Sequence, residues 1–400
     1  MSEMSITRRT FLSAGALVTG GVALSGPLSL ANYSGSASEL RIGIIGTGDR
    51  GTGLASFFKD IPHFRLAACC DILPFKLSNG MKYGDETTKA YEQYEALLED
   101  KNVDAVIIAT PFNTHARIAM DAIEAGKHVY CEKTLSYGME DTRRLVAKAR
   151  ASKKIFQTGH QYHSSRLYHH IVDMVRKGYI GEVSTIECQW NRNGDWRRPV
   201  PDPKWERQIN WRMYREYSGG LVAELCSHQI DFANWITGQH PTKVAGFGGI
   251  DHWKDGRETY DNIHLIMEYA NGLKATYTCL TTNARGDYQI KVLGNEGTIV
   301  VNYGEARVYP ESNKIAELGT VDGVSSATLK SWQSGEGIAI KVEHRNPSLQ
   351  ALLDFSEAIE KGKQPLSNIE TGARAAVTVQ MALDAMDHNR TEYWKDEYNF

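Results

Sequence analysis

A glycine-rich turn between an apolar run and a helix-like segment narrows the folds open to this chain. Residues 40–46 read LRIGIIG, which has the character of a buried strand, and GTGDRG leads on into GLASFFKDI. In G-x-G-x-x-G the first glycine permits a tight turn, the second lets a ligand approach the backbone, and the third brings helix and strand together. This order of elements predicts a site for the pyrophosphate of a dinucleotide. The residues expected there are Gly46, Gly48, Asp49, Arg50 and Gly51.

A second apolar run, RLAACCD, ends at Asp71, which lies 25 residues after Gly46. An acidic side chain at a spacing of about 20 residues accepts hydrogen bonds from the adenosine ribose. A carboxylate there also repels a 2′-phosphate, so we expect NAD rather than NADP, although Arg50 and Lys76 could weaken that preference. The other interpretation of Asp71 is an N-cap of the next helix.

The following segments alternate between apolar strands and an amphipathic helix. Residues 103–110 and 128–133 have the composition of buried strands, and HARIAMDAIEAGK lies between them. This alternation predicts a doubly wound parallel sheet, the α/β Rossmann architecture, over residues 39–155. Ligands bind at the carboxyl ends of such strands, so the residues just beyond them should face the cofactor. These residues are Thr110, Pro111, Asn113, His115, Glu132 and Lys133.

Beyond residue 155 the strands alternate apolar and polar side chains and are separated by turn signals such as Asn271-Gly272. Such alternation is typical of an antiparallel sheet with one face covered and one face open. Helices are expected at 166–177 and 221–236, and two more amphipathic helices near the end of the chain. We therefore predict an α+β domain over residues 156–400, built on a large, mostly antiparallel, open-faced sheet.

The first residues differ from the rest of the chain. Residues 1–31 combine Arg8 and Arg9 with a Gly- and Ala-rich apolar run and small residues near a cleavage site. They resemble a twin-arginine signal peptide, followed by a polar linker at 32–38, and predict a periplasmic protein exported in folded form. A membrane anchor is the alternative. After export, six cysteines would face an oxidising compartment, and we expect them to be buried free thiols.

Longer stretches resemble the Gfo/Idh/MocA family, which includes glucose–fructose oxidoreductase and inositol dehydrogenase. The matching pieces cover essentially the whole chain after residue 39 and include GIIGTGDRG, ATPFNTHARIAMDAIEAGKHVYCEK, GGLVAELCSHQID and GNEGTIVV. The resemblance implies that Lys133 is the catalytic lysine of a Glu-Lys-Pro motif, in which Thr134 stands here instead of proline. It also implies a GG-x-L-x-D-x-x-x-H motif, in which Glu224 replaces the aspartate and His228 is kept.

The expected chemistry needs these residue types. Removing hydride from a carbinol carbon requires the hydroxyl proton to leave, so a base with a pKa near neutral must touch that oxygen. His228 suits this task at its ordinary pKa. Lys133 can hydrogen-bond the same oxygen and stabilise its developing charge. The predicted catalytic residues are therefore Lys133 and His228 as an acid–base pair, with Glu224 in support.

A histidine-rich segment, GHQYHSSRLYHH at 159–170, follows the first domain. A metal site is not expected there, because His160, His163, His169 and His170 lack a ligand set with carboxylate or thiolate. Polar groups that line the cleft are the simpler interpretation, and Gln161 is assigned to the cofactor.

The segment WNRNGDWRRPVPDPKWERQINWRMYREY at 190–217 interleaves tryptophan and arginine. The net charge of −3 argues against nucleic acid and against an anionic membrane. Aromatic faces with polar groups suit a carbohydrate, and a subunit interface is the alternative. Family members usually associate through the open sheet face, which implies a homodimer or homotetramer. The predicted substrate residues are Lys133, His163, Arg166, Asn191, Trp196, Glu224 and His228.

Three functions are compatible with these features. The first is an exported NAD-dependent oxidoreductase that acts on a hydroxyl of a sugar, polyol or glycoside. The second is an NAD-dependent glycoside hydrolase that oxidises a hydroxyl transiently, eliminates the aglycone and returns the hydride. The third is a non-catalytic sensor of sugar or NAD on the same fold, against which Lys133 and His228 argue.

Overall fold

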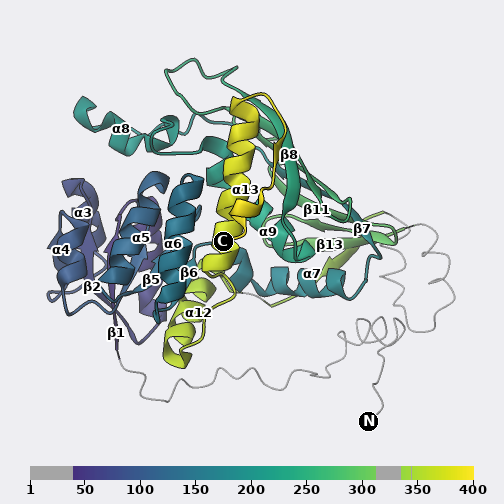
Figure 1. Ribbon diagram of the computed structural model, residues 1–400. Helices are drawn as coiled ribbons and strands as arrows, with labels where there is room; N and C mark the ends of the chain where they lie inside the picture. The colour runs from purple at the N-terminus through teal and green to yellow at the C-terminus, as the bar shows by residue number, and fades with distance from the viewer. Residues whose placement is uncertain (1–38, 312–334, 344) are drawn as a thin grey trace, which may run out of the picture.

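The computed structural model describes residues 39–311, 335–343 and 345–400, so the expected signal peptide and linker lie outside the described residues. These residues form two domains with one sheet each (Figure 1). The first sheet is parallel, in the order β3-β2-β1-β4-β5-β6, which is the predicted doubly wound arrangement. Its strands are β1 (Leu40–Ile45), β2 (Phe64–Cys70), β3 (Lys89–Tyr91), β4 (Ala105–Ile108), β5 (His128–Cys131) and β6 (Phe156–Thr158).

Helices cover both faces of this sheet, which explains why its central strands are almost wholly apolar. Every residue of β4 is buried, because side chains on each face meet a helix. One face packs against α4 (Tyr94–Glu99), α5 (His115–Glu124) and α6 (Met139–Ala151). The other packs against α2 (Asp49–Ala55) and α3 (Pro74–Met81).

The second sheet has nine strands in the order β14-β13-β12-β11-β7-β10-β9-β8-β15. All of its pairs are antiparallel except β7 with β10, which confirms the mostly antiparallel prediction. The strands are β7 (Val183–Trp190), β8 (Pro241–Gly249), β9 (Asn262–Tyr269), β10 (Lys274–Leu280), β11 (Tyr288–Gly294), β12 (Gly297–Val301), β13 (Ala306–Pro310), β14 (Ile338–Ile340) and β15 (Glu392–Tyr393).

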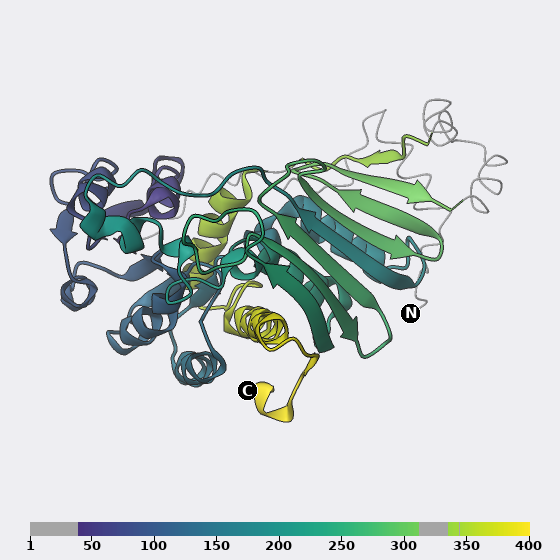
Figure 2. The same ribbon diagram turned by 90° about the horizontal axis from the view of Figure 1, so that it is seen from above.

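Among the described residues, helices cover one face of the larger sheet. Figure 2 shows α13 (Ile369–Asp387, yellow) on that side, where α7 (Arg166–Arg176) and α9 (Ser227–Thr237) also pack. On β9 the residues alternate between buried and more accessible, and the accessible ones include Ile266. Phe247 on β8 is 74% exposed. This pattern fits the open sheet face that the sequence predicts.

Helix α12 (Pro347–Lys361) lies apart from the second sheet, although it comes late in the chain. Its apolar side, with Leu352 and Phe355, packs on the face of the first sheet where Ile107 and Tyr130 point. The division at residue 155 therefore needs correction. The parallel sheet continues to β6, and α12 completes the core of the first domain because α2 and α3 leave part of that face uncovered.

All six cysteines are free and buried, as the sequence predicts. Within the described ranges, no helix is both long and apolar enough to cross a membrane. In the same ranges, no group of three or more His, Cys, Asp or Glu residues comes together as metal ligands would.

Replacing Phe355 with alanine tests the role of α12 in the first domain. Phe355 is fully buried, so Phe355→Ala should lower the free energy of unfolding by about 3–5 kcal/mol through lost burial and a residual cavity. Tyr83→Ala is the control, because that ring is 46% exposed, lies outside the open sheet face, and its loss should change stability by less than about 0.5 kcal/mol. Chemical denaturation measures both. Equal effects would contradict the assignment of α12 to the core.

Candidate active site

The glycine turn has the close contacts that its sequence pattern predicts. Gly46 has φ +92°, and a Cβ there would lie 2.7 Å from the Ala109 carbonyl. A Cβ on Gly51 would lie 2.0 Å from the Gly46 carbonyl oxygen, so only glycine lets α2 approach β1 this closely. Gly48 differs, because nothing lies within 4 Å of its Cβ position. The first and third glycines thus shape the turn, and the second leaves open space for a ligand.

Asp71 joins the end of β2 to the glycine turn. Its carboxylate accepts hydrogen bonds from the backbone N–H of Thr47 at 2.8 Å and of Leu73 at 2.9 Å. Burial raises the pKa of Asp71, and these hydrogen bonds oppose that rise. The N-cap residue of α3 is Leu73, so Asp71 is not its N-cap. The carboxylate lines the cleft described next, as a ribose-binding group must.

A cleft of about 480 Å³ opens at the carboxyl ends of β1, β2 and β4. This volume lies in the range of ordinary small-molecule sites. Five basic and three acidic side chains line the cleft, and two of the basic ones, Arg50 and Arg212, are paired with carboxylates outside the lining, Glu132 and Glu224. The glycine turn, Asp71 and these N–H donors fit a dinucleotide. The charged residues are Arg50, Lys76, Arg117, Arg198, Arg212, Asp49, Asp71 and Glu92.

Some predicted cofactor residues line this cleft and others have structural contacts instead. Those that line it are Gly46, Gly48, Asp49, Arg50, Asp71, Thr110 and Pro111. His115 does not present a free nitrogen, because Nδ1 lies 2.8 Å from the Thr134 carbonyl and Nε2 lies 2.9 Å from the Thr110 carbonyl. His115 is thus a buried link between the ends of β4 and β5, and direct cofactor contact by its ring has to be withdrawn.

Three further predicted cofactor residues lie outside the cleft lining. Glu132 is buried and pairs with Arg50, with Nε and Oε1 2.6 Å apart. Asn113 donates its backbone N–H to the Tyr217 carbonyl at 3.3 Å. The side-chain oxygens of Asn113 and Gln161 are buried without a hydrogen-bond partner. Glu132 therefore holds Arg50, which lines the cleft, while Glu132 itself does not line it.

Lys133 reaches from the end of β5 into the second domain. Its Nζ donates to the backbone carbonyl of Glu224 at 2.8 Å, and Thr134 donates to the carbonyl of Ala223 at 2.9 Å. The peptide bond between Lys133 and Thr134 is cis. Burial lowers the pKa of Lys133, while Glu224 and Glu132 favour its charged form. The end of β5 is thereby fastened to the second domain.

Glu224 lies in a π-helical turn, Val222–Cys226, which runs directly into α9. Its carboxylate accepts a hydrogen bond from Arg212 at 3.0 Å and one from Ser218 at 3.3 Å. Glu224 and His228 are four residues apart but do not share a regular α-helical face, because Glu224 lies in the π-helical turn and α9 begins only at Ser227. Glu224 thus meets Lys133 through its backbone carbonyl, while its side chain is engaged by Arg212.

His228 lies in a buried aromatic group together with His160 and Tyr162. Its Nδ1 is buried without a hydrogen-bond partner. His160 is fully buried, and both of its ring nitrogens also lack a hydrogen-bond partner. Burial lowers the pKa of His228 well below its ordinary value, and repulsion from the Lys133 ammonium lowers it further. His228 is therefore neutral and has a free ring nitrogen, but the same burial makes that nitrogen a weaker base than an ordinary histidine.

The predicted substrate residues do not all gather in one place. His163 is buried with Nε2 2.9 Å from Asp231, so it is a paired core histidine and not a substrate contact. Arg166 is exposed at the start of α7, away from the cleft. Asn191 is buried, and its side chain donates to the Arg285 carbonyl at 3.1 Å. Trp196 is partly buried, with Arg192 against its ring.

Two parts of the site escaped the sequence analysis. His160 was weighed as a metal ligand or as one of several polar groups of the cleft and was given no role of its own, yet it stands beside His228 and its ring nitrogens have no partner. The segment after β7 was assigned to the substrate, but several of its residues line the dinucleotide cleft. A signal for the second finding was present, since that segment carries the arginines that an anionic ligand needs. These residues are Arg198, Pro199, Gln208, Ile209, Trp211, Arg212 and Tyr217.

The glycine turn yields a direct test by substitution. Gly51→Ala should prevent α2 from closing on β1, because its Cβ would meet the Gly46 carbonyl oxygen, and should lower both the melting temperature and NAD affinity. Gly53→Ala in the same helix is the control, because nothing lies within 4 Å of its Cβ position and alanine should stabilise the helix by about 1 kcal/mol. Thermal unfolding and titration calorimetry provide the measurements. A Gly51→Ala protein as stable as wild type would refute the contact.

Acid should destabilise the fold through its buried neutral histidines. Burial lowers the pKa of His115, His160 and His228, whereas the unfolded chain takes up these protons near pH 6.5. Stability is therefore lost as the pH falls through about 6.5. His160→Gln should reduce the loss between pH 7 and 5 by up to about 2 kcal/mol. Urea unfolding across this range, with the exposed His252→Gln as control, measures it. Parallel profiles for wild type and His160→Gln would be contrary evidence.

Comparison with known proteins agrees with this geometry. Residues 40–160 match the Gfo/Idh/MocA profile described as an oxidoreductase family with an NAD-binding Rossmann fold, and residues 168–300 match the GFO/IDH/MocA C-terminal domain. Myo-inositol 2-dehydrogenase of Thermotoga maritima is 25% identical over 359 residues, covering 88% of this chain and 98% of that protein.

Solved structures share the fold. Aldose-aldose oxidoreductase from Caulobacter crescentus, complexed with glycerol, superposes with a TM-score of 0.70 at 22% identity, over 89% of this chain and 100% of that one. Levoglucosan dehydrogenase in complex with NADH gives a TM-score of 0.71 at 19% identity, over 88% of this chain and 98% of that one. The two matched profiles together span more than half of the sequence, and the chain belongs to the Gfo/Idh/MocA family of NAD-binding oxidoreductases.

Proposed function

We propose that the protein transfers hydride between NAD(H) and a secondary hydroxyl of a sugar, polyol or glycoside, with Lys133 and His228 as the acid–base pair. The observation that carries this proposal is a buried lysine at the end of β5 whose charge reaches a buried, neutral histidine; neither side chain belongs to the lining of the dinucleotide cleft. Lys133 is held by the Glu224 carbonyl, and its charge acts on the His228 ring. Bound nicotinamide would supply the hydride acceptor or donor.

The two residues divide the proton chemistry. In the direction of oxidation the hydroxyl of the substrate loses its proton, and the neutral His228 ring can accept it. Lys133 has three N–H donors, of which one is used by the Glu224 carbonyl, so another can stabilise negative charge on the substrate oxygen. Arg212 holds the Glu224 side chain and thereby helps to fix the turn that anchors Lys133.

Sugar or polyol substrates are supported by the names of similar proteins, which include myo-inositol 2-dehydrogenase, aldose-aldose oxidoreductase and levoglucosan dehydrogenase. Export to the periplasm is supported by Arg8, Arg9 and the apolar run that follows them. Association into a homodimer or homotetramer is supported by the exposed Phe247 and Ile266 on the open sheet face.

Lys133→Met tests the acid–base assignment. The substitution keeps the length of the side chain but removes the ammonium, so turnover should fall by roughly 10²–10⁴-fold while NAD affinity stays within a few-fold of wild type. The exposed Lys177→Met is the control with the same chemical change. Full turnover by Lys133→Met would remove the proposed role.

The reaction itself is tested with the gently purified full chain. Mass spectrometry should detect bound NAD(H), and sugars, polyols and aryl glycosides should be screened for nicotinamide absorbance and for released aglycone. Net change at the nicotinamide band supports the dehydrogenase. Release of aglycone without net reduction would favour the NAD-dependent glycoside hydrolase, and neither signal would favour a sensor.

A further inference from the structure

The cleft has a wall that the sequence did not assign to the cofactor, formed by residues 195–217 of the second domain. We call this segment the strap. It leaves the second sheet after β7 and carries a short helix, α8 (Glu206–Ile209), across to the first domain, where Figure 1 shows it above α3 and α5. Arg198, Ile209, Trp211, Arg212 and Tyr217 of the strap line the same cleft as the glycine turn and Asp71.

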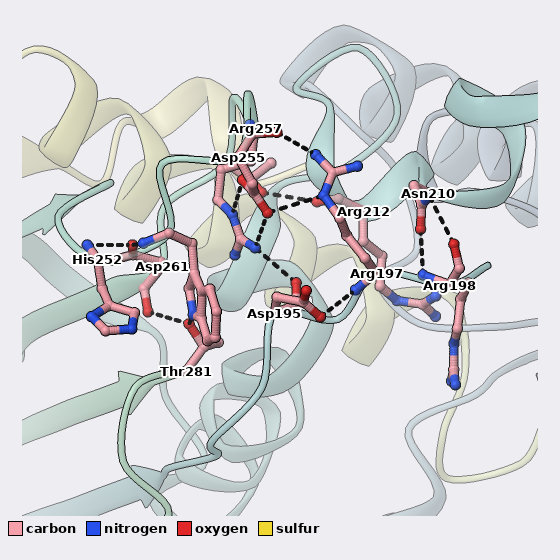
Figure 3. A network of polar contacts seen from close by, with 12 residues as sticks. Asp195, Arg197, Arg198, Asn210, Arg212, His252, Asp255, Arg257, Asp261 and Thr281 are labelled. Atoms are coloured by element: carbon pink, nitrogen blue, oxygen red, sulfur yellow. Dashed lines mark hydrogen bonds and ion pairs between the residues drawn. The ribbon is translucent and has the colours of Figure 1, made fainter. Parts of the chain in front are cut away.

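The base of the strap is fixed by a network of charges around one buried arginine, Arg257 (Figure 3). The Arg257 side chain is only 2% exposed and donates to both oxygens of Asp255, at 2.9 and 2.7 Å, and to the Asp195 carbonyl at 2.8 Å. Arg197 of the strap donates to Asp255 at 3.0 Å and to Glu206 at 2.5 Å. Removal of one member would leave a charge without its partner, so the base should resist opening.

A buried amide extends this rigidity to the cleft. Asn210 is 3% exposed; its Oδ1 accepts the backbone N–H of Arg198 at 2.7 Å, and its Nδ2 donates to the Arg198 carbonyl at 3.2 Å. The backbone of Arg198 is therefore fixed, while its side chain extends away from the network in Figure 3. That side chain is 64% exposed and therefore free to change partners.

The contact that Arg198 makes with the first domain is much weaker than this network. Arg198 lies 3.1 Å from Asp49, the residue that opens α2 beside the glycine turn. Asp49 is 70% exposed and also lies 3.4 Å from Lys76. Ion pairs of this exposure add little to the stability of a fold and are screened by salt. A rigid base with a weak connection at the mouth of the cleft can admit a ligand without unfolding.

We propose that the strap is a second cofactor-binding surface, and that the Arg198–Asp49 pair is a latch that slows release of the dinucleotide. The inference rests on the proposed function, because it takes NAD as the ligand. The strap thereby lengthens the time for which the dinucleotide stays bound, and the latch contributes one exposed ion pair to that delay.

Release of labelled NAD⁺ from the full chain tests this proposal. The loaded protein is mixed with excess unlabelled NAD⁺, and the bound label is followed by rapid gel filtration. Arg198→Ala and Asp49→Asn should each release the label roughly two- to five-fold faster than wild type, as expected for the loss of one exposed ion pair. Arg144→Ala is the control, because Arg144 is 61% exposed and pairs with a carboxylate on α6, away from the cleft. Its release rate should equal that of wild type.

The Asp49→Asn variant distinguishes a latch from simple attraction between Arg198 and the phosphates. If Arg198 acts only through its charge, removal of the neighbouring carboxylate should leave release unchanged or slow it, and either result overturns the latch. Loss of the label from wild type during desalting also overturns it. If both substitutions accelerate a slow release but the protein transfers no hydride, the proposed function is refuted and the role of the strap stands. If the protein turns over while its cofactor exchanges freely, the role of the strap is refuted and the proposed function stands.

Discussion

The site depends on two hydrogen bonds that cross between the domains. Lys133 and Thr134, at the end of a first-domain strand, donate to the carbonyls of Glu224 and Ala223 in the π-helical turn of the second domain. A π-helical turn pairs its backbone groups one residue further along than an α-helix, and such turns are frequent at functional sites. Because these bonds align the end of β5 with the start of α9, they set Lys133 against His228. Any shift of one domain on the other would disturb this pair.

Burial decides the charge states around this junction. His228 and His160 are shielded from water, and neither has the carboxylate partner that keeps His163 paired with Asp231. Burial therefore lowers the pKa of both imidazoles, and the neighbouring Lys133 ammonium acts in the same direction. The fold thus keeps His228 neutral, because it buries the ring and places the Lys133 charge near it. The ordinary pKa of histidine, on which the sequence argument relied, does not apply there.

Local patterns in the sequence predicted much of the fold. The glycine turn was predicted because its sharp bend requires glycine, and the alternating strands of the second sheet were predicted from their apolar periodicity. The three-residue strands β3, β6 and β14 were missed, since so few residues carry no readable period. The place of α12 was also missed. Its amphipathic pattern predicts a helix, but the sheet that the helix covers depends on packing distant in sequence.

The candidate site divides along the same line. The glycines and Asp71 were identified because their roles depend on residues close in sequence: the glycines allow close backbone contacts, and Asp71 ends the strand next to the glycine turn. His115, Glu132 and His163 were assigned by neighbourhood, yet their side chains are engaged by contacts from elsewhere in the chain. Sequence position could indicate the end of the sheet on which they lie. It could not indicate whether a side chain faces the ligand or a partner.

The position of α12 also bears on how the protein is made. The sheet that carries the glycine turn is complete by residue 158, but Ile107 and Tyr130 on one face remain uncovered until residues 347–361 have left the ribosome. The nascent first domain therefore carries an exposed apolar face for most of translation. Stable capture of a dinucleotide should accordingly be a late event, one that follows synthesis of nearly the whole chain.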